Sequence, residues 1–214
     1  MADLRIMTNS GAEAVVHAST VQAFQASVQG AIIRSGCADY ESARKTWNGM
    51  IDKYPALITR CTGVADVIAA VRFARDHDLL VAVRGGGHSL PGFSVCDDGM
   101  VIDLSQMKAI RVDPVKRTAA AQAGLTWGDY DRETQVFGLA STGGVIATTG
   151  IAGLTLGGGH RLAHAQVRPG LRSSAFRRSG HRRWPVPDRQ HHGESRPVLG
   201  HARRRRQFWH RHFL

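Results

Sequence analysis

The strongest indication of the fold comes from one stretch of the sequence, Val81-Ala-Val-Arg-Gly-Gly-Gly-His-Ser-Leu-Pro-Gly92. Its first three residues form an apolar run long enough for a buried strand. The glycines at 85–87 permit positive φ angles and place no Cβ in the way of a ligand, which is how backbone N–H groups usually hold a pyrophosphate. Arg84 and His88 flank them with side chains suited to an anion and to a reactive centre. We predict a strand that ends in a phosphate-binding loop; the alternative is a plain glycine turn between two strands.

A second glycine-rich stretch follows about fifty residues later, at Ser141-Thr-Gly-Gly-Val-Ile-Ala-Thr-Thr-Gly-Ile-Ala-Gly-Leu-Thr-Leu-Gly-Gly-Gly159. Seven of these nineteen residues are glycine, which is too many for the interior of a helix or strand. Ser and Thr hydroxyl groups are interspersed among them. Such a segment is suited to wrap around a flat, polar ligand.

Together the two stretches closely resemble the flavin-binding half of the FAD-linked oxidases of the vanillyl-alcohol oxidase superfamily, specifically the berberine-bridge-enzyme-like branch. The resemblance runs from about Pro55 to Gly159. Its most specific pieces are Arg84-Gly-Gly-Gly-His-Ser89, Val101-Ile-Asp-Leu-Ser105 and Gly150-Ile-Ala-Gly-Leu-Thr-Leu-Gly-Gly-Gly159. The stretch Trp47-Asn-Gly-Met-Ile-Asp52 resembles the family's entry segment.

This resemblance implies FAD as the cofactor, bound covalently from a ring nitrogen of His88 to the flavin 8α carbon; the alternative is a histidine that only bonds the backbone of a tight turn. Neutral imidazole is nucleophilic enough near neutral pH. Some family members attach the flavin a second time through a cysteine, but Gly144-Val-Ile-Ala147 contains none, so a single linkage is expected. The expected cofactor-binding residues are Arg84, Gly85, Gly86, Gly87, His88, Ser89, Thr142, Gly143, Gly144, Thr148, Thr149, Gly150 and Gly153. Ordinary capping and turn bonding is the alternative for the hydroxyls.

The resemblance also implies an activity. A small-molecule alcohol, sugar or amine-type carbon would be oxidised by hydride transfer to the flavin, and molecular oxygen would reoxidise it. The family's substrate domain and active-site base lie further along than these 214 residues reach. No catalytic base can therefore be named, and we expect the 214-residue chain to be inactive. The substrate, and the choice between oxidase and dehydrogenase, stay open.

Hydrophobic periodicity and turn residues predict an α+β fold with a mixed sheet. Expected helices cover 12–33, 63–77 and 126–137, and expected strands cover 55–60, 81–83, 100–104, 108–113 and 118–123. Residues 1–10 read as a frayed terminus. The strand, helix and strand from Ala56 to Val83 form a βαβ unit. No G-x-G-x-x-G fingerprint of a nicotinamide-binding fold is present, which makes that cofactor the weaker hypothesis.

We accordingly expect three regions. Residues 1–50 would be a helical lead-in, and 51–159 a PCMH-type FAD-binding domain with a small βαβ N-terminal subdomain, incomplete at its C-terminus. Residues 160–214 would be an arginine-rich tail. The net charge of +11 belongs to that tail alone: residues 1–159 carry 14 Lys and Arg against 15 Asp and Glu, whereas 160–214 carry 14 Arg against two acids.

A change of reading frame near codon 160 accounts for the tail. With a one-base offset, residues 160–169 decode as I-G-W-L-M-R-K-Y-G-L, a family-like continuation, and the arginines at 203–206 become four glycines. We expect such a segment to be disordered, because it has few aliphatic residues to offset the entropy of ordering. The alternative is a genuine basic tail of a nucleic-acid-binding protein, which is disfavoured by the lack of lysine and of any recognisable binding motif.

Cysteines and hydropathy narrow the class further. Cys37, Cys61 and Cys96 are odd in number and widely spaced, which argues against a disulfide framework and a zinc site and favours buried free thiols. No run of 18 apolar residues and no secretory signal occurs. We therefore expect a cytoplasmic protein with no metal, no membrane span and no nucleic-acid partner.

Overall fold

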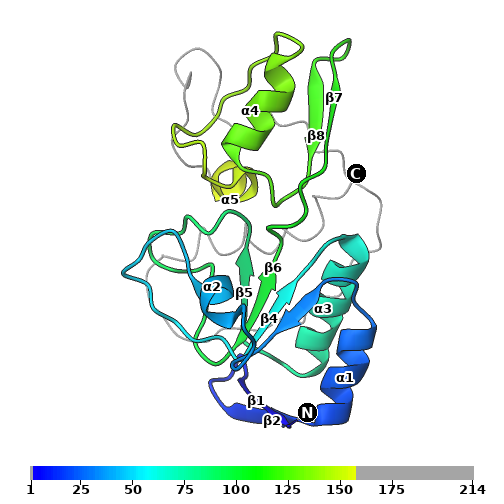
Figure 1. Cartoon of the computed structure of the whole chain (residues 1–214), viewed down its shortest axis with the longest axis vertical. Coiled ribbons are helices and arrows are strands. Elements are labelled where there is room, and N and C mark those ends of the chain that lie inside the picture. Colours follow the sequence, from blue (N-terminus) through cyan, green and yellow to red (C-terminus); the bar gives the residue numbers. More distant parts are fainter. Residues whose placement is uncertain (1, 158–214) are drawn as a thin grey trace, which may run out of the picture.

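Strand β6 (Met100–Asp103) lies at the centre of the protein, whose structure is a computed structural model that describes residues 2–157 (Figure 1). All four of its residues are buried, as is typical of a parallel strand covered on both faces. β4 (Leu57–Arg60) and β5 (Val81–Arg84) pair with it in parallel, and β3 (Ala31–Ile33) runs antiparallel to β4. The sheet order is β3-β4-β6-β5, so the predicted α+β class with a mixed sheet is confirmed. The predicted tail at 160–214, with its reading frame, lies outside the described residues.

The predicted βαβ unit is present with one difference. Helix α3 (Val64–Asp76) connects β4 to β5, and the two strands are parallel, but they are not neighbours because β6 is inserted between them. The periodicity of a segment does not reveal that a later strand takes the central place. As a result, the carboxyl ends of all three parallel strands lie side by side, with Arg60 and Arg84 each in register with Asp103.

Two layers of helices cover this sheet. Met100 and Ile102 face the core shared with α1 (Ala18–Ala26) and α3, whereas Val101 faces the core shared with α2 (Tyr40–Arg44). This alternation follows the two-residue repeat of a strand. Figure 1 shows α1 and α3 together on one side of the sheet and α2 on the other.

The N-terminal region differs from the prediction. In place of a frayed terminus and one helix over 12–33, β1 (Leu4–Met7) and β2 (Glu13–Val16) form an antiparallel hairpin, and the helix is restricted to α1. Gly11 turns the hairpin with φ +82°. The 1–50 lead-in is thus only partly helical, and through β3 it contributes a strand to the central sheet.

A close backbone contact explains why the helix ends before Gly30. A Cβ at this position would lie 1.9 Å from the Arg60 carbonyl oxygen, so only glycine fits beside β4. The buried Asp66 carboxylate accepts hydrogen bonds from the backbone N–H groups of Gln29 and Gly30 and from Thr62 at the start of α3. These contacts direct the chain from α1 into the sheet.

Beyond β6 the chain forms a second unit, which we call the hairpin unit (residues 110–157; upper part of Figure 1). It contains the hairpin of β7 (Ile110–Asp113) and β8 (Thr118–Ala121), helix α4 (Trp127–Gln135) and helix α5 (Ile151–Gly157). Thr126 and Asp129 form a capping box at the start of α4. Trp127 is buried with Leu125 and Ile151.

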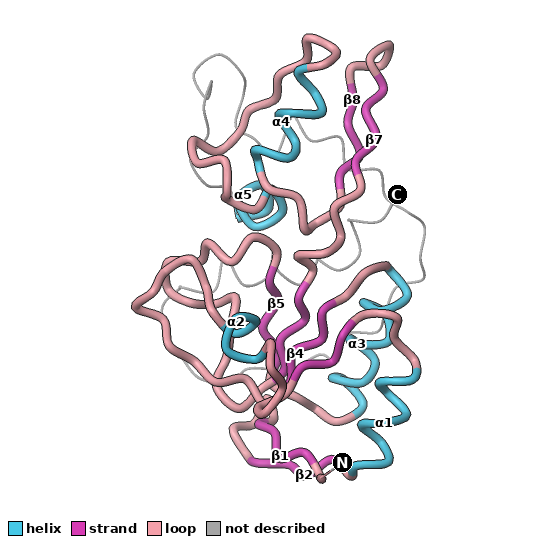
Figure 2. The backbone as a smooth tube through the Cα atoms, in the orientation of Figure 1, coloured by secondary structure: helices cyan, strands magenta, loops and turns pink. Residues whose placement is uncertain are grey.

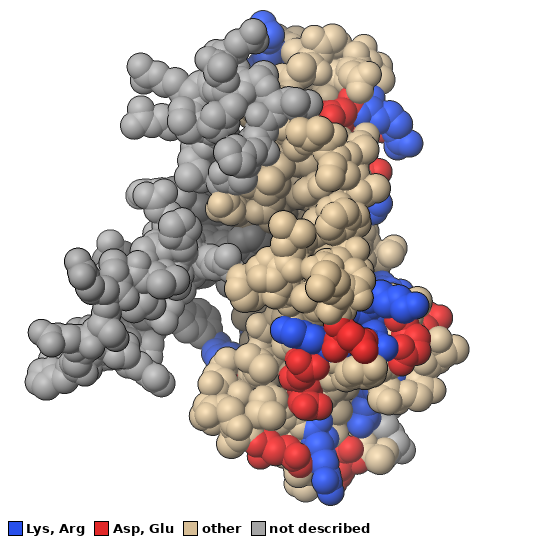
Figure 3. All heavy atoms as spheres, turned by 90° about the vertical axis from the view of Figure 1, so that its left-hand side faces the viewer, with Lys and Arg blue, Asp and Glu red and all other residues tan. Residues whose placement is uncertain are grey.

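The cysteine prediction is correct for two residues and wrong for the third. Burial raises the pKa of Cys61 to about 12 and that of Cys96 to about 11, so both thiols stay protonated and structural. Cys37 is free but exposed, because it lies in the turn between β3 and α2. On the face seen in Figure 3, charged side chains gather over the lower part of the molecule and the middle is largely uncharged.

Candidate functional site

The glycine loop after β5, residues 85–87, lies against the hairpin unit. A Cβ at Gly86 would lie 2.4 Å from the nitrogen and 2.6 Å from the Cα of Gly150, and a Cβ at Gly85 would lie 2.9 Å from the Ala123 carbonyl oxygen. Gly87 adopts φ +69°, a conformation that favours glycine. These residues therefore permit a backbone-to-backbone contact that brings together the two glycine-rich stretches. Figure 2 shows the loop directly beneath α5.

His88 follows the loop and is held by the second stretch. Its Nε2 lies 3.0 Å from the Thr148 hydroxyl oxygen, and its Nδ1 lies 3.3 Å from that of Thr149. A neutral imidazole has one N–H donor and one acceptor nitrogen, and a hydroxyl can serve either, so the pair complements the neutral ring. Burial lowers the pKa of His88, which also favours the neutral form. The Trp47 ring stacks on the imidazole at 4.8 Å between centroids and 19° between planes.

Arg84 is paired with an acidic residue inside the protein. Its guanidinium is buried: Nη2 donates to Asp103 Oδ2 at 2.8 Å, and Nη1 donates to the Lys45 carbonyl oxygen at 3.3 Å. Asp103 also accepts from the Ser105 N–H at 3.0 Å, and Arg60 Nε approaches it at 3.5 Å. Burial by itself would raise the pKa of Asp103, but the hydrogen bond and charge of Arg84 lower it overall. The Arg84 charge is thus neutralised within the protein, and Asp103 is its structural partner.

A pocket of about 240 Å³ opens beside the loop. It is lined by Ser42, Ala43, Lys45, Thr46, Trp47, Arg60, Arg84, Gly85, Gly86, Gly87, Asp103 and Ser105. Three of these residues are cationic and one is acidic, a net charge of +2 on the lining. Such a pocket attracts an anion, and the Lys45 and Arg60 side chains were not among the predicted site residues. Lys45 directly follows α2 and Arg60 ends β4, so only the folded chain brings these two residues together.

The remaining predicted residues are distributed over the hairpin unit. Gly143 and Gly144 pack against the Trp127 ring, where a Cβ would come within 2.9 Å and 2.8 Å of it. Thr142 is buried. A Cβ at Gly153 would meet nothing within 4 Å. Ser89 is the one remaining predicted residue outside this unit, and its hydroxyl accepts a hydrogen bond from the Phe93 N–H at 3.0 Å.

Within residues 2–157 no helix is long and apolar enough to cross a membrane. In the same part of the chain, no group of three or more His, Cys, Asp and Glu side chains is arranged to hold a metal ion.

A glycine loop at the carboxyl ends of parallel strands, next to a cationic pocket, is the arrangement with which α/β sheets bind phosphate-bearing ligands, dinucleotides among them. Residues 55–167 match the family model described as FAD binding domain, and the chain belongs to this family. The match covers both glycine-rich stretches and runs eight residues beyond Gly159, where we expect the reading frame to change. FAD is therefore the dinucleotide for which this domain is built.

Named relatives agree with this assignment. An FAD-linked oxidoreductase of Dictyostelium discoideum is 38% identical over 154 residues, which is 72% of this chain and 33% of the relative. (R)-6-hydroxynicotine oxidase of Paenarthrobacter nicotinovorans is 36% identical over 133 residues, which is 62% of this chain and 29% of the relative. The chain thus spans about a third of the length of these relatives.

Solved structures show the same fold. The crystal structure of 6-hydroxy-D-nicotine oxidase from Arthrobacter nicotinovorans has a TM-score of 0.61 at 36% identity, over 63% of this chain and 30% of that one. A berberine-bridge-enzyme-like protein of Physcomitrella patens has a TM-score of 0.62 at 29% identity, over 66% and 31%. The predicted resemblance to FAD-linked oxidases of the berberine-bridge-enzyme-like branch is confirmed.

Proposed function

We propose that this chain is the FAD-binding part of an oxidoreductase that oxidises an alcohol, sugar or amine-type carbon of a small molecule. Bound FAD would supply the chemistry, by accepting a hydride from the substrate and passing two electrons to molecular oxygen. One observation carries the proposal: the two ring nitrogens of His88, next to the glycine loop, lie at hydrogen-bond distance from the Thr148 and Thr149 hydroxyls. Relatives named as FAD-linked oxidoreductases and as an oxidase support it.

The residues present fit the dinucleotide. A pyrophosphate carries two negative charges, and the pocket lining beside Gly85–Gly87 carries a net charge of +2. The glycines of the loop add backbone N–H groups, which a ligand can approach because glycine has no Cβ atom. We propose that the loop and Ser89 bind the pyrophosphate, while Arg84 holds the loop in place through Asp103.

A covalent bond between a His88 ring nitrogen and the flavin 8α carbon is the second part of the proposal. The His88 nitrogen would replace one hydrogen of the methyl group, with the methyl proton and the imidazole N–H proton lost to solvent. The two electrons released would be accepted by the bound cofactor and finally by molecular oxygen, which would become hydrogen peroxide. His88 contributes a neutral ring, which its lowered pKa favours, and Thr148 and Thr149 fix the two nitrogens at the ring edge.

The other predicted contacts complete the proposed site. Thr142, Gly143, Gly144, Gly150 and Gly153 would follow the flavin and its ribityl chain. We infer that the 214-residue chain by itself turns over no substrate, because it spans about a third of the length of its relatives. Among the described residues that line the pocket, the one carboxylate is Asp103, which is paired with Arg84. Substrate-dependent reduction of flavin by this chain would contradict that inference.

Acid precipitation tests the linkage. The full 214-residue chain, produced without flavin and incubated with FAD in air, should give a yellow, fluorescent precipitate in acid. His88→Ala should release all flavin to the supernatant. His17→Ala, a change at an exposed histidine between β2 and α1, should behave as wild type. Flavin that stays attached in His88→Ala excludes this residue as the link. A wild-type chain that binds no FAD refutes the proposed function.

A further inference from the structure

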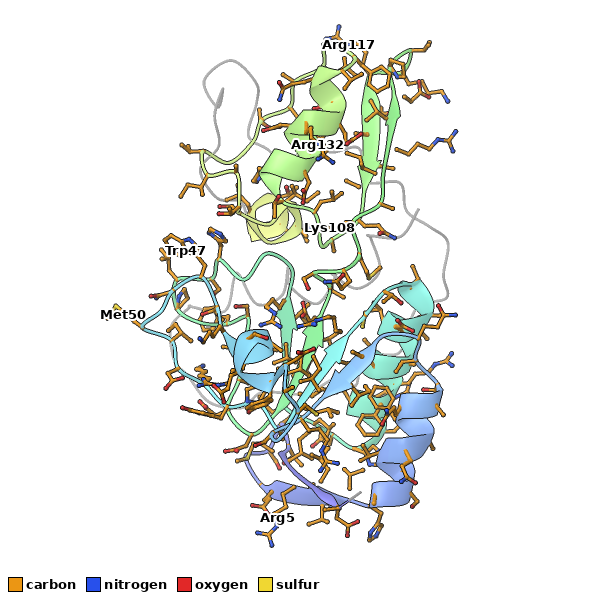
Figure 4. All side chains as sticks on the ribbon, in the orientation of Figure 1. Arg5, Trp47, Met50, Lys108, Arg117 and Arg132 are labelled. Atoms are coloured by element: carbon orange, nitrogen blue, oxygen red, sulfur yellow. The ribbon has the colours of Figure 1, made fainter. Side chains whose placement is uncertain are left out.

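Trp47 contacts His88 in a way that ordinary packing does not explain. Its side chain remains 54% exposed, so it adds little to the core, yet its ring lies nearly parallel to the imidazole. Stacked aromatic pairs of this spacing contribute beyond the area that they bury. Figure 4 shows Trp47 on the side of its loop that faces the hairpin unit, whereas Met50 points away from the molecule at the tip of the same loop.

The position of Trp47 is fixed by three contacts between its loop and the glycine loop. Its own N–H donates to the Gly87 carbonyl oxygen at 3.2 Å. On one side of it, the Lys45 carbonyl accepts from Arg84, and on the other, Asn48 Nδ2 donates to the Leu90 carbonyl at 3.0 Å. These hydrogen bonds tie the two loops together and hold the indole over the imidazole.

These contacts act on different parts of the histidine. The indole covers one face of the ring, while Thr148 and Thr149 hold its two nitrogens at the edge. A bond to a ring nitrogen forms in the plane of the ring, so one threonine hydroxyl must release its nitrogen when the bond forms. A partner on the face of the ring restricts rotation and leaves that in-plane position accessible. Holding a reacting group in the right orientation is itself a large part of rate enhancement.

We propose that Trp47 is a positioning residue, which stacks on His88 and holds the imidazole in the orientation from which a ring nitrogen bonds the flavin. This inference rests on the proposed covalent attachment of FAD through His88. It assigns to Trp47 an effect on the rate of attachment that differs from any effect on folding stability.

The test compares four forms of the full 214-residue chain, prepared without flavin: wild type, Trp47→Ala, Trp47→Phe and Met50→Ala. Met50 is the matched control, because it lies in the same loop and its side chain is 91% exposed. After FAD is added in air, acid-stable flavin is measured over time. Trp47→Ala should attach flavin about tenfold more slowly, the upper limit for losing an aromatic pair. Trp47→Phe should regain most of the rate, and Met50→Ala should match wild type.

A second measurement needs no flavin. In proton NMR spectra of the flavin-free chain, the His88 ring protons should be shifted upfield by the indole, and this shift should disappear in Trp47→Ala and persist in Met50→Ala. If the shift disappears while attachment keeps its wild-type rate, the positioning role is overturned and the proposed function stands. If the wild-type chain forms no acid-stable flavin, the covalent proposal fails and this inference fails with it.

Discussion

Replacing Asp103 by asparagine should destabilise the protein strongly, because it leaves the buried Arg84 guanidinium without a counter-charge. The Asp103 side chain is 1% exposed and that of Arg84 8%, and 2.8 Å separate the Arg84 Nη2 from the Asp103 Oδ2. Breaking a buried ion pair on one side costs about 3–5 kcal/mol. Asparagine keeps an acceptor for the Ser105 N–H, and Arg84 keeps the Lys45 carbonyl, so the lower end, about 3 kcal/mol, is expected. For a chain of this size that lowers Tm by about 6–12 °C.

Thermal and urea unfolding, followed by circular dichroism and tryptophan fluorescence, measure this loss. Asp113→Asn is the control: Asp113 lies on the surface of the β7–β8 hairpin, pairs with Lys116 at 3.3 Å, and its replacement should leave the free energy of unfolding nearly unchanged. Replacing both partners, as Arg84→Met with Asp103→Leu, should cost less than Asp103→Asn alone, since no buried charge is then left unpaired. Equal losses in Asp103→Asn and Asp113→Asn would refute the assigned role of the pair.

Three further predictions concern the site and the gene. Gly86→Ala should lose about 1–3 kcal/mol in urea unfolding and weaken FAD binding in calorimetry, since its methyl group would lie 2.4 Å from the Gly150 nitrogen; Gly49→Ala, with nothing within 4 Å, should lose neither. The rate of FAD attachment should rise with pH, because the neutral His88 reacts, with a midpoint below about 6.5 owing to its lowered pKa; a midpoint above that value contradicts the assignment. Sequencing the gene should reveal a family-like reading frame that continues after codon 159 in the neighbouring frame, shifted by one base. A stop codon in that shifted frame soon after codon 159 would count against the frame change.

Local patterns were sufficient for elements whose signal lies within their own residues. The helix now seen as α3 has its apolar residues at helical spacing and an acid in its first turn, and the strand at Val81–Arg84 is marked by the glycines that follow. The hairpin β1–β2 has no such signal, because its strands are four residues long and are stabilised by Leu79, Leu80 and Asp98, far along the chain. The insertion of β6 between β4 and β5 is likewise a long-range event.

The residues of the candidate site likewise differ in whether the local sequence reveals them. His88, Thr148 and Thr149 could be named because their glycine-rich stretches carry the family's motifs, and the structure brings them together. The sequence places Trp47 in a segment that resembles the family's entry segment but indicates no role for it, because only the folded loops bring its ring onto His88. The glycines beside Arg84 suggest that it meets an anion, which stays a prediction; its ion pair with Asp103 depends on the register of two parallel strands and has no signal in the local sequence.

The contact between Gly86 and Gly150 has a consequence for the order in which the protein is made and assembled. The two residues are 64 positions apart, so a nascent chain can complete the four-stranded sheet well before Gly150 leaves the ribosome. At that stage His88 has neither threonine partner, because Thr148 and Thr149 are not yet available. Flavin attachment would then follow docking of the hairpin unit, and acid-stable yellow colour would record how much of the protein had completed that docking correctly.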